Sequence, residues 1–388
     1  MAEYKTQIAI IGGGICGLWL LDALTRAGHD ALLLERDRLG SQQTLASQGM
    51  IHGGIKYALG GFATAASETI AGMPARWSDC LAGKAAPDLS GVRLLSRDYY
   101  LFSDSSLSSR VTAFFGSRSI RGRVQPLPRA AFPAFFANEA FKGSLYRLQD
   151  MVLDTVSLVA TLAERGAGRI YRCDPKVCLD DGGTFSLVDI GGDNQLSADT
   201  WIFAAGAGNG QLLHDAGIEI STQTRPLRQV MVKSPTLPAL YAHGVSLDAG
   251  AKPRITITTH PAADGDNVWY LGGQLAETGV ARADAEQVAF AAQELAQLFP
   301  WLSLAGATWR SFLINRAEPD QAGGGRPDSP YCRAFGNVIV CWPTKLTLTP
   351  LLADQLLGVL QSPPQGSANT SLPLPPALPG SPPWEQLF

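Results

Sequence analysis

The first part of the chain alternates between apolar runs and one turn rich in glycine. Residues 8–11 are apolar without polar alternation, which predicts a strand buried on both faces. The glycine turn at 12–17 leads into an apolar segment with helical spacing, and residues 32–34 predict a second buried strand that ends at Glu35. A strand, a turn, a helix and a second strand in this order are typical of a parallel α/β sheet.

Elements of the same kind return in the middle and at the end of the chain. We expect helices over 64–82, 154–165 and 351–360, and buried strands over 200–208 and 337–341. Two further strands are expected over 171–179 and 184–190, because residues 180–183 (Asp-Asp-Gly-Gly) have the composition of a hairpin turn.

Short strands with an alternating pattern interrupt these elements twice. Residues 229–233, 254–259 and 268–271 are separated by Pro, Asp and Gly, as in an antiparallel sheet. A helix is predicted over 284–298. Residues 92–145 mix short apolar runs with Pro, Ser and Arg, and they predict strands and loops.

The pattern as a whole predicts an α/β fold (α+β overall) in two domains. A Rossmann-like nucleotide-binding domain would be discontinuous and consist of residues 1–80, 150–220 and 320–362. A mainly antiparallel domain, expected to bind the substrate, would consist of residues 81–149 and 221–319.

The last segment, residues 363–388, is rich in proline. Proline fixes the backbone in extended conformations, so we expect a polyproline-like tail. Trp384 or Phe388 could pin this tail to the rest of the protein.

Composition narrows the class of protein. A chain of 388 residues with 46% hydrophobic and 17% charged residues is long enough for more than one globular domain. A net charge of −3 gives no reason to expect nucleic-acid binding. The six cysteines are scattered without a histidine cluster, so no metal site is expected. No apolar stretch reaches ~18 residues, so we expect no integral membrane segment and a cytoplasmic protein, at most peripheral to a membrane.

The glycine turn has the Gly-x-Gly-x-x-Gly spacing of dinucleotide sites. Gly12 allows the tight turn, Gly14 lets a pyrophosphate approach the backbone, and Gly17 lets helix and strand pack closely. Glu35 follows at about the ~20-residue offset of a carboxylate that bonds a ribose hydroxyl, and it would repel the 2′-phosphate of NADP. The alternative is a glycine-rich turn that binds nothing.

Four segments, in chain order, carry a resemblance to a known family. They are the glycine turn with Glu35, Phe203–Gly208, Asn315–Asp320 and Asn337–Pro350. With these segments the chain resembles the D-amino-acid oxidase superfamily of FAD-dependent oxidoreductases. The resemblance implies FAD as the cofactor and a Rossmann-like domain beside a substrate domain.

Two shorter segments are similar to FAD-dependent glycerol-3-phosphate dehydrogenase and its 2-hydroxyacid relatives. His52–Tyr57 (His-Gly-Gly-Ile-Lys-Tyr) is similar to a His-Gly-Gly-Leu-Arg-Tyr segment of the former, and Lys345–Thr347 is similar to its Lys-Leu-Thr segment. The residues that these resemblances imply as contacts of FAD are Gly12, Gly14, Gly17, Glu35, Arg36, Ser47, Gly49, Val177, Ala205, Gly206, Lys345, Leu346 and Thr347.

Lys345 and Arg316, which lie in the segments 345–347 and 315–320, suit flavin chemistry. In such chemistry the protein positions the substrate and stabilises the reduced flavin ring. Lys345 would stabilise negative charge on the ring, and the alternative is a surface lysine. Arg316 would hold a carboxylate or phosphate of the substrate. The alternative for Arg316 is a structural ion pair with Glu318 or Asp320.

His52 is the candidate for proton transfer. It could accept the substrate's proton, bond to FAD non-covalently, or carry a covalent bond to the 8α-methyl group of the flavin, as a histidine does in some relatives. The alternative is a buried histidine with satisfied hydrogen bonds. Lys56 and Tyr57 are weaker candidates for the same pocket.

The leading hypothesis is an FAD enzyme that takes a hydride from the C–OH carbon of a small anionic substrate, a 2-hydroxy acid or a polyol phosphate. The second hypothesis is oxidation of a C–N bond of an amino or imino acid, and the third is a non-catalytic FAD-binding subunit. The electron acceptor, oxygen or quinone, is left open. A quinone would require contact with a membrane surface through the tail or through the aromatic residues of 132–136, for which packing between domains is the simpler interpretation.

Overall fold

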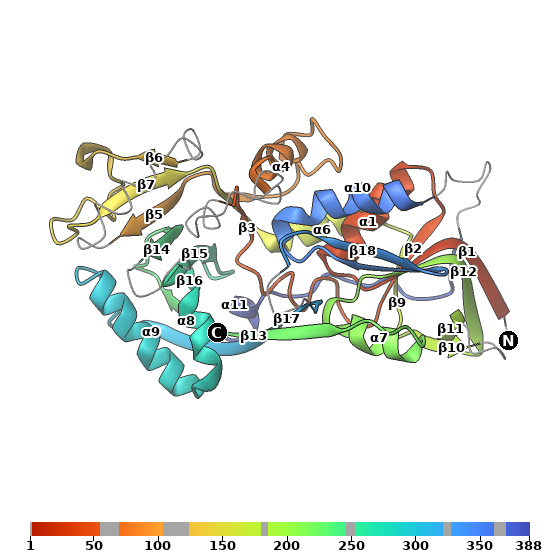
Figure 1. The fold of residues 1–388 in the computed structure, drawn as a ribbon. Helices are drawn as coiled ribbons and strands as arrows, with labels where there is room; N and C mark the ends of the chain where they lie inside the picture. Colours follow the sequence, from red (N-terminus) through yellow and green to blue (C-terminus); the bar gives the residue numbers. More distant parts are fainter. Residues whose placement is uncertain are drawn as a thin grey trace.

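The computed structural model describes residues 2–54, 70–103, 124–179, 185–245, 253–320, 327–360 and 370–388. The described strands form two eight-stranded sheets and a small three-stranded sheet. In Figure 1 the first large sheet occupies the half of the molecule that contains the N-terminus, and the second occupies the other half. The C-terminus lies beside the second sheet.

The first sheet contains the predicted parallel core. Strand β1 (Ala2–Ile11) pairs in parallel with β2 (Ala31–Glu35) on one side and with β12 (Asn194–Phe203) on the other. The further strands of this sheet are β9 (Ile170–Arg172), β10 (Lys176–Leu179), β11 (Phe185–Gly191), β18 (Tyr331–Phe335) and β19 (Val338–Trp342). Every side chain of residues 8–11 is buried, because the sheet is covered on both faces.

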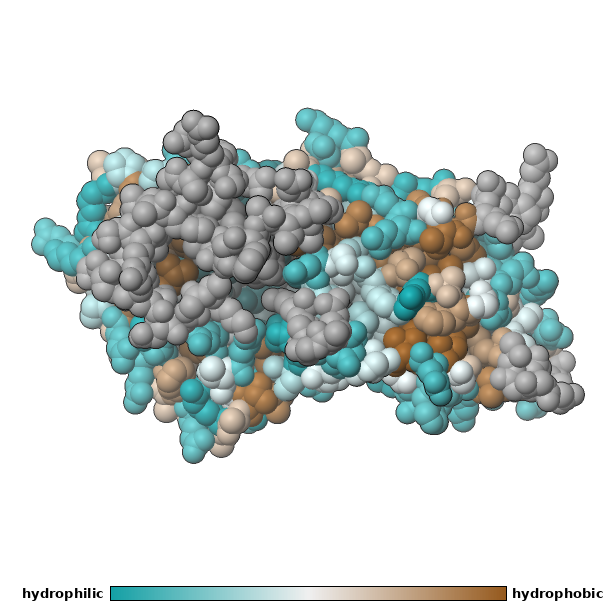
Figure 2. Space-filling model, viewed as in Figure 1, coloured by the Kyte–Doolittle hydropathy of each residue, from teal (hydrophilic) through white to brown (hydrophobic). Residues whose placement is uncertain are grey.

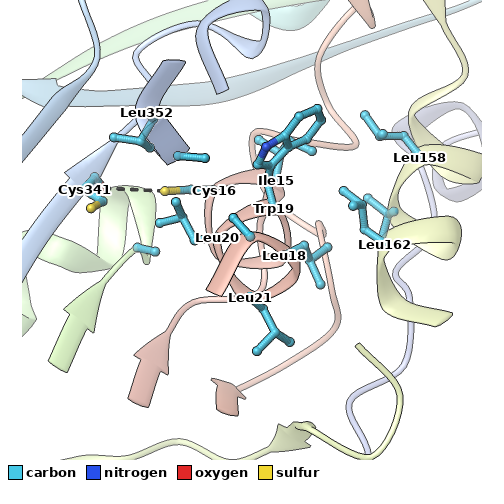
Figure 3. Packing of buried hydrophobic residues seen from close by; sticks show 14 of the residues in the cluster. Ile15, Cys16, Leu18, Trp19, Leu20, Leu21, Leu158, Leu162, Cys341 and Leu352 are labelled. Atoms are coloured by element: carbon cyan, nitrogen blue, oxygen red, sulfur yellow. Dashed lines mark hydrogen bonds between the residues drawn. The ribbon is translucent and has the colours of Figure 1, made fainter. Parts of the chain in front are cut away.

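One face of this sheet is covered by α1 (Ile15–Arg26), α6 (Thr155–Arg165) and α10 (Thr349–Val359). Figure 3 shows α1 from close by, with Leu158 and Leu162 of α6 on one side and Leu352 of α10 on the other. Asp22 of α1 is buried and accepts a hydrogen bond from Nε of Arg165 at 2.6 Å. Apolar packing and this bond together fix α1, whose N-terminus follows the glycine turn.

The second sheet is mainly antiparallel, with a parallel pair between β5 and β14. Its strands are β5 (Tyr99–Ser103), β6 (Val124–Pro126), β7 (Ser144–Leu148), β13 (Thr222–Ser234), β14 (Ala242–Val245), β15 (Ile255–Pro261), β16 (Asn267–Gly272) and β17 (Thr308–Pro319). Helix α9 (Asp284–Leu298) packs into the core on one face. Phe136 is fully buried in that core, and the partly buried Phe132 and Phe135 pack against it.

A small sheet joins β3 (Met50–Ile51), β4 (Leu94–Ser96) and β8 (Met151–Leu153). The shorter helices and turns are α4 (Met73–Leu81), η2 (Arg129–Ala131), η3 (Gly206–Gly208), α7 (Asn209–Asp215), α8 (Gln274–Thr278), η4 (Gly279–Ala281), η5 (Leu346–Leu348) and α11 (Pro383–Gln386). Among the described residues, no helix has the length and apolar character needed to cross a bilayer. On the face shown in Figure 2, apolar residues form separate groups among polar ones.

Most predicted helices and strands lie within a few residues of their expected bounds, but the strand over 171–179 is wrong. Its residues form two strands at opposite edges of the first sheet. β9 ends at Arg172 beside β2, and β10 begins at Lys176 beside β11. Pro175 lies in the segment between β9 and β10, where the backbone does not have to donate a hydrogen bond to a neighbouring strand. The apolar pattern of the segment cannot show that the chain changes edges.

Two other predicted elements are shorter than expected. The strand over 200–208 ends at Phe203, because Gly206 takes a positive φ of 58° in a turn. The helix over 64–82 is observed as α4 from Met73, and residues 64–69 lie outside the described part of the chain.

The two large sheets draw on different parts of the chain. The first takes its strands from 2–35, 170–203 and 331–342, and the second from 99–148 and 222–319. We therefore keep the two-domain division as a proposal, with boundaries near residues 80, 150, 220 and 320.

Gly17 has no space for a side chain. A Cβ there would lie 2.0 Å from the backbone oxygen of Gly12 and 3.1 Å from Cδ1 of Leu33. Gly17→Ala should therefore lower the free energy of unfolding by about 1–3 kcal/mol, the usual cost of overpacking, as measured by urea denaturation.

Gly358 of α10 provides the matched control. A Cβ at Gly358 has no neighbour within 4 Å, so Gly358→Ala should preserve or raise stability. A Gly17→Ala variant as stable as the parent protein would contradict this account of the packing.

Candidate active site

One large cavity, of about 1310 Å³, is lined by both large sheets. It exceeds the ~300–1,000 Å³ of a typical small-molecule pocket, so it has room for a dinucleotide and a substrate together. The first sheet contributes the carboxyl ends of β1, β2, β12 and β19, and the second contributes parts of β13 and β17. Ligands of open parallel sheets bind at this end of the strands.

The glycine turn lies where β1, β12 and α1 meet. Gly12 has a φ of +115°, and a Cβ there would lie 2.5 Å from Cα of Ala205. Gly14 precedes α1 in an extended conformation, and the N–H of Ile15 donates to Oγ1 of Thr44 at 3.0 Å. The N-terminus of a buried helix therefore faces the cavity, an arrangement that binds phosphate.

Glu35 ends β2, and two backbone groups hold its carboxylate. The N–H of Gly13 donates to Oε2 at 2.7 Å, and the N–H of Asp37 donates to Oε1 at 2.9 Å. Arg36 and Val177 also line the cavity. A carboxylate fixed in this way suits the hydroxyl groups of a ribose.

Residues 43–49, which we call the wall loop, connect the first sheet to the second. Nε2 of Gln48 donates to the backbone oxygen of Tyr270 at 2.9 Å and to Oγ1 of Thr258 at 3.3 Å. The hydroxyl of Tyr270 donates to the backbone oxygen of Ala46 at 2.6 Å. The wall loop therefore follows β2 in the chain but is held by β15 and β16.

His52 and Lys345 are far apart in sequence but lie in adjoining segments of the cavity wall. The N–H of His52 donates to Oγ1 of Thr347 at 3.1 Å. Lys345 follows β19, its side chain is only 3% exposed, and its Nζ lies 3.2 Å from Oδ1 of Asp328. The alternative of a surface lysine is therefore wrong.

Arg316 of β17 lines the cavity, with its side chain 16% exposed. Its Nη2 lies 3.8 Å from Oε1 of Glu277, and its Nε donates to the backbone oxygen of Arg225 at 3.3 Å. The structure thus adds Glu277 as a partner that the sequence did not indicate. Glu318, a partner suggested by the sequence, lies 3.5 Å from Arg225.

Sequence reasoning missed side chains that the second sheet contributes to the cavity. Gln229 of β13 is buried, and its Oε1 has no hydrogen-bond partner within the part of the chain that the structure describes. Oε1 of Gln48 and Oε1 of Gln229 would lie 2.6 and 3.3 Å from a Cβ on Gly272, so two amide groups meet at the end of β16. Gln274 and Glu277 of α8 also line the cavity. Strand and helix patterns carry no signal for such residues.

Most of the predicted site residues line this one cavity. They are Gly12, Gly14, Glu35, Arg36, Ser47, Gly49, His52, Val177, Ala205, Gly206, Arg316, Lys345, Leu346 and Thr347. Gly17 lies behind the turn, against Gly12. Lys56 and Tyr57 are outside the described residues. The roles assigned to all of these residues stay predictions.

Cys16 lies inside the glycine turn but points into the protein. Its thiol donates to the backbone oxygen of Cys341 at 3.9 Å (Figure 3). Burial raises the pKa of the Cys16 thiol far above its ordinary value, so it stays protonated and serves packing. Within the described ranges, no group of three His, Cys, Asp or Glu side chains could hold a metal ion.

Comparisons with known proteins show the family of the chain. The model of the FAD dependent oxidoreductase family (DAO) matches residues 7–341. Over 99% of its length the chain is 44% identical to the probable FAD-dependent oxidoreductase PA4991 of Pseudomonas aeruginosa, of which it covers 98%. The crystal structure of PA4991 matches with a TM-score of 0.85 and 39% identity, over 100% of this chain and 99% of that chain.

Two solved structures of lower identity share the fold. Glycine oxidase from Geobacillus kaustophilus matches with a TM-score of 0.66 and 19% identity, over 94% of this chain and 97% of its own. L-alpha-glycerophosphate oxidase from Mycoplasma pneumoniae, with FAD bound, matches with a TM-score of 0.66 and 15% identity. The match covers 96% of this chain and 99% of the oxidase chain. The family model and PA4991 each span most of the chain, which therefore belongs to the FAD-dependent oxidoreductases of the D-amino-acid oxidase superfamily.

Proposed function

We propose that this FAD-dependent oxidoreductase removes a hydride from the C–OH carbon of a small organic anion, either a 2-hydroxy acid or a polyol phosphate. When bound, the flavin supplies the hydride acceptor. The observation that supports the proposal is that Arg316, Lys345 and His52 line the same cavity as the glycine turn. An anion-binding group, a cation for the reduced ring and a proton acceptor are thus available together.

The residues present fit FAD at both ends of the cavity. Gly12 permits the tight turn against Ala205, and Gly14 would let a pyrophosphate approach the backbone at the start of α1. The fixed carboxylate of Glu35 suits the ribose. The segment after β19 would hold the flavin end, where the buried Lys345 would stabilise negative charge.

We propose that FAD is bound non-covalently, with His52 as the candidate residue if a covalent bond exists. Acid precipitation of the FAD-loaded protein distinguishes the two forms. Flavin in the supernatant supports non-covalent binding, and flavin retained in the pellet contradicts it.

Arg316 is the proposed anchor of the substrate. A guanidinium carries five N–H donors, so it can hold Glu277 and a substrate carboxylate or phosphate at once. Its low exposure strengthens the attraction, because little water screens the charges.

His52 is the proposed proton acceptor. A histidine nitrogen that faces the substrate would take the hydroxyl proton as the hydride leaves. The hydrogen bond from its backbone to Thr347 fixes the position of the residue, and its burial excludes bulk water.

A second candidate function is oxidation of a C–N bond, which a specific set of side chains favours. Gln48, Gln229 and Glu277 bring amide and carboxylate oxygens to the second-sheet side of the cavity. Such oxygens accept hydrogen bonds from an amine, which offers more N–H donors than a hydroxyl group offers O–H donors.

Anaerobic reduction of the holoenzyme separates these functions. We expect 2-hydroxy acids or polyol phosphates to bleach the visible absorption of the flavin. Bleaching by amino or imino acids alone would replace the proposal with the second candidate. A flavin that no member of either class reduces would point to the non-catalytic subunit. Reoxidation of the bleached enzyme by oxygen or by a quinone then identifies the acceptor.

Arg316→Lys keeps the positive charge and removes the planar fork. We expect kcat/KM for the substrate to fall about 100-fold, with most of the change in KM and with FAD affinity unchanged. Arg282→Lys, at an arginine outside the cavity lining, is the control. An Arg316→Lys enzyme with the parent KM would remove Arg316 from the substrate site.

Glu35→Gln keeps the shape of the side chain and removes its charge. The Kd of FAD should rise about tenfold, because a charge-assisted hydrogen bond to the ribose is lost. Flavin fluorescence during titration of the apoprotein measures this change. The control is Glu164→Gln, at an exposed position on α6 outside the cavity lining, and equal affinities for both variants would contradict the assigned role of Glu35.

A further inference from the structure

Residues 370–388, which we call the strap, contact both large sheets. On the first sheet, β9 donates a backbone hydrogen bond to the oxygen of Pro375 at 2.7 Å. The N–H of Leu39 donates to the oxygen of Leu378, and the N–H of Gly380 donates to the oxygen of Leu39, both at 2.9 Å. The strap therefore adds hydrogen bonds to the edge of the first sheet and to the segment that follows β2.

The end of the strap docks on the second sheet, where Figure 1 places α11 and the C-terminus beside β13. Trp384 of α11 is 3% exposed and stacks on His260 with ring centroids 4.2 Å apart. The N–H of Ala263 donates to Oε1 of Glu385 at 2.8 Å. This buried tryptophan confirms the expectation that an aromatic residue pins the tail.

Tyr270 forms one connection between the strap and the wall loop. Its ring centroid lies 6.1 Å from that of Trp384, and both side chains belong to one apolar cluster. The other end of Tyr270 reaches the wall loop, where its hydroxyl donates to the backbone oxygen of Ala46. Displacement of Tyr270 would therefore displace a backbone group of the cavity wall.

His260 forms a second connection. Its Nε2 lies 3.0 Å from Oγ1 of Thr258, and the same oxygen lies 3.3 Å from Nε2 of Gln48. Burial lowers the pKa of His260 to about 3, so the ring is neutral and one of its nitrogens accepts. The hydroxyl of Thr258 can then donate to His260 while it accepts from Gln48.

We propose that the strap positions the wall loop against the cofactor, and that Trp384 is the positioning residue for Ala46 and Gln48. Trp384 packs against Tyr270 and His260. Tyr270 donates a hydrogen bond to Ala46, and His260 is connected to Gln48 through the hydroxyl of Thr258. The strap contacts both large sheets, and the wall loop contacts α1 and the second sheet, so the two segments fix the cavity wall together. The proposal concerns FAD binding and does not depend on which substrate is oxidised.

A purely stabilising strap would behave differently. It would lower the melting temperature of the protein when Trp384 is removed, but the folded protein would bind FAD with its original affinity. If the strap positions the wall loop, removal of Trp384 lowers the affinity of the folded protein for FAD, because FAD binding must then also order the wall loop.

The test compares Trp384→Ala, Trp384→Phe and the control Leu378→Ala, at a strap side chain that is 57% exposed. Apoprotein of each full-length variant is titrated with FAD, and its melting temperature is recorded. We expect the Kd of FAD to rise about tenfold in Trp384→Ala, a typical coupling between separate sites. Trp384→Phe should restore most of the affinity, because it keeps an aromatic ring on His260. A Trp384→Ala variant with a lower melting temperature and the parent Kd would overturn the proposal.

Two variants that leave the strap intact test the connections and do not depend on how Trp384→Ala folds. Tyr270→Phe removes the hydroxyl that holds Ala46, and Thr258→Val removes the hydroxyl between His260 and Gln48. Each should raise the Kd of FAD, and the parent Kd in both would overturn the proposal.

In the double variant Trp384→Ala/Thr258→Val, the fold increase in the Kd of FAD should be smaller than the product of the two single increases, because both changes act through the wall loop. Independent, multiplicative effects would contradict it.

Discussion

Three backbone segments approach one another at Gly12 so closely that no side chain fits between them. β1 ends just before it, the segment that follows β12 passes at Ala205, and the first turn of α1 packs behind it at Gly17. A Cβ at either glycine would overlap backbone atoms, which cannot move without separating strand from helix. Because α1 is fixed in this way, its N-terminus and the carboxylate of Glu35 face the same cavity. The position of the cofactor depends on this approach more than on any single hydrogen bond.

The rest of the cavity is assembled from segments that are distant in sequence. His52 follows the first βαβ segment, Arg316 comes from the second sheet, and Lys345 follows the last strand of the first sheet. Each cation has a carboxylate within 4 Å, which stabilises its charge in a partly buried site. The wall loop connects the two sheets across this region, so the relative position of the sheets determines the shape of the site.

The parts of the fold and site that the sequence predicts are those where function requires a residue type at fixed spacing. The glycine turn and Glu35 are of this kind. The Lys345–Thr347 segment came from a resemblance to a family, and α9 (Asp284–Leu298) from alanines on one side of the helix. The hydrophobic pattern does not predict the order of strands in a sheet, because that order depends on tertiary packing. The chain leaves β9 at one edge of the first sheet and enters β10 at the other. Gln229 and Glu277 escaped prediction because a polar residue in a strand or a short helix has the same local pattern whether it faces solvent or a cavity.

A crystal structure of the holoenzyme with a small, unreactive carboxylate tests the central claim most directly. The account predicts the pyrophosphate of FAD at the glycine turn, the flavin ring beside Lys345 and His52, and the carboxylate on the guanidinium of Arg316. A carboxylate bound away from Arg316, or a flavin ring far from Lys345, would contradict it.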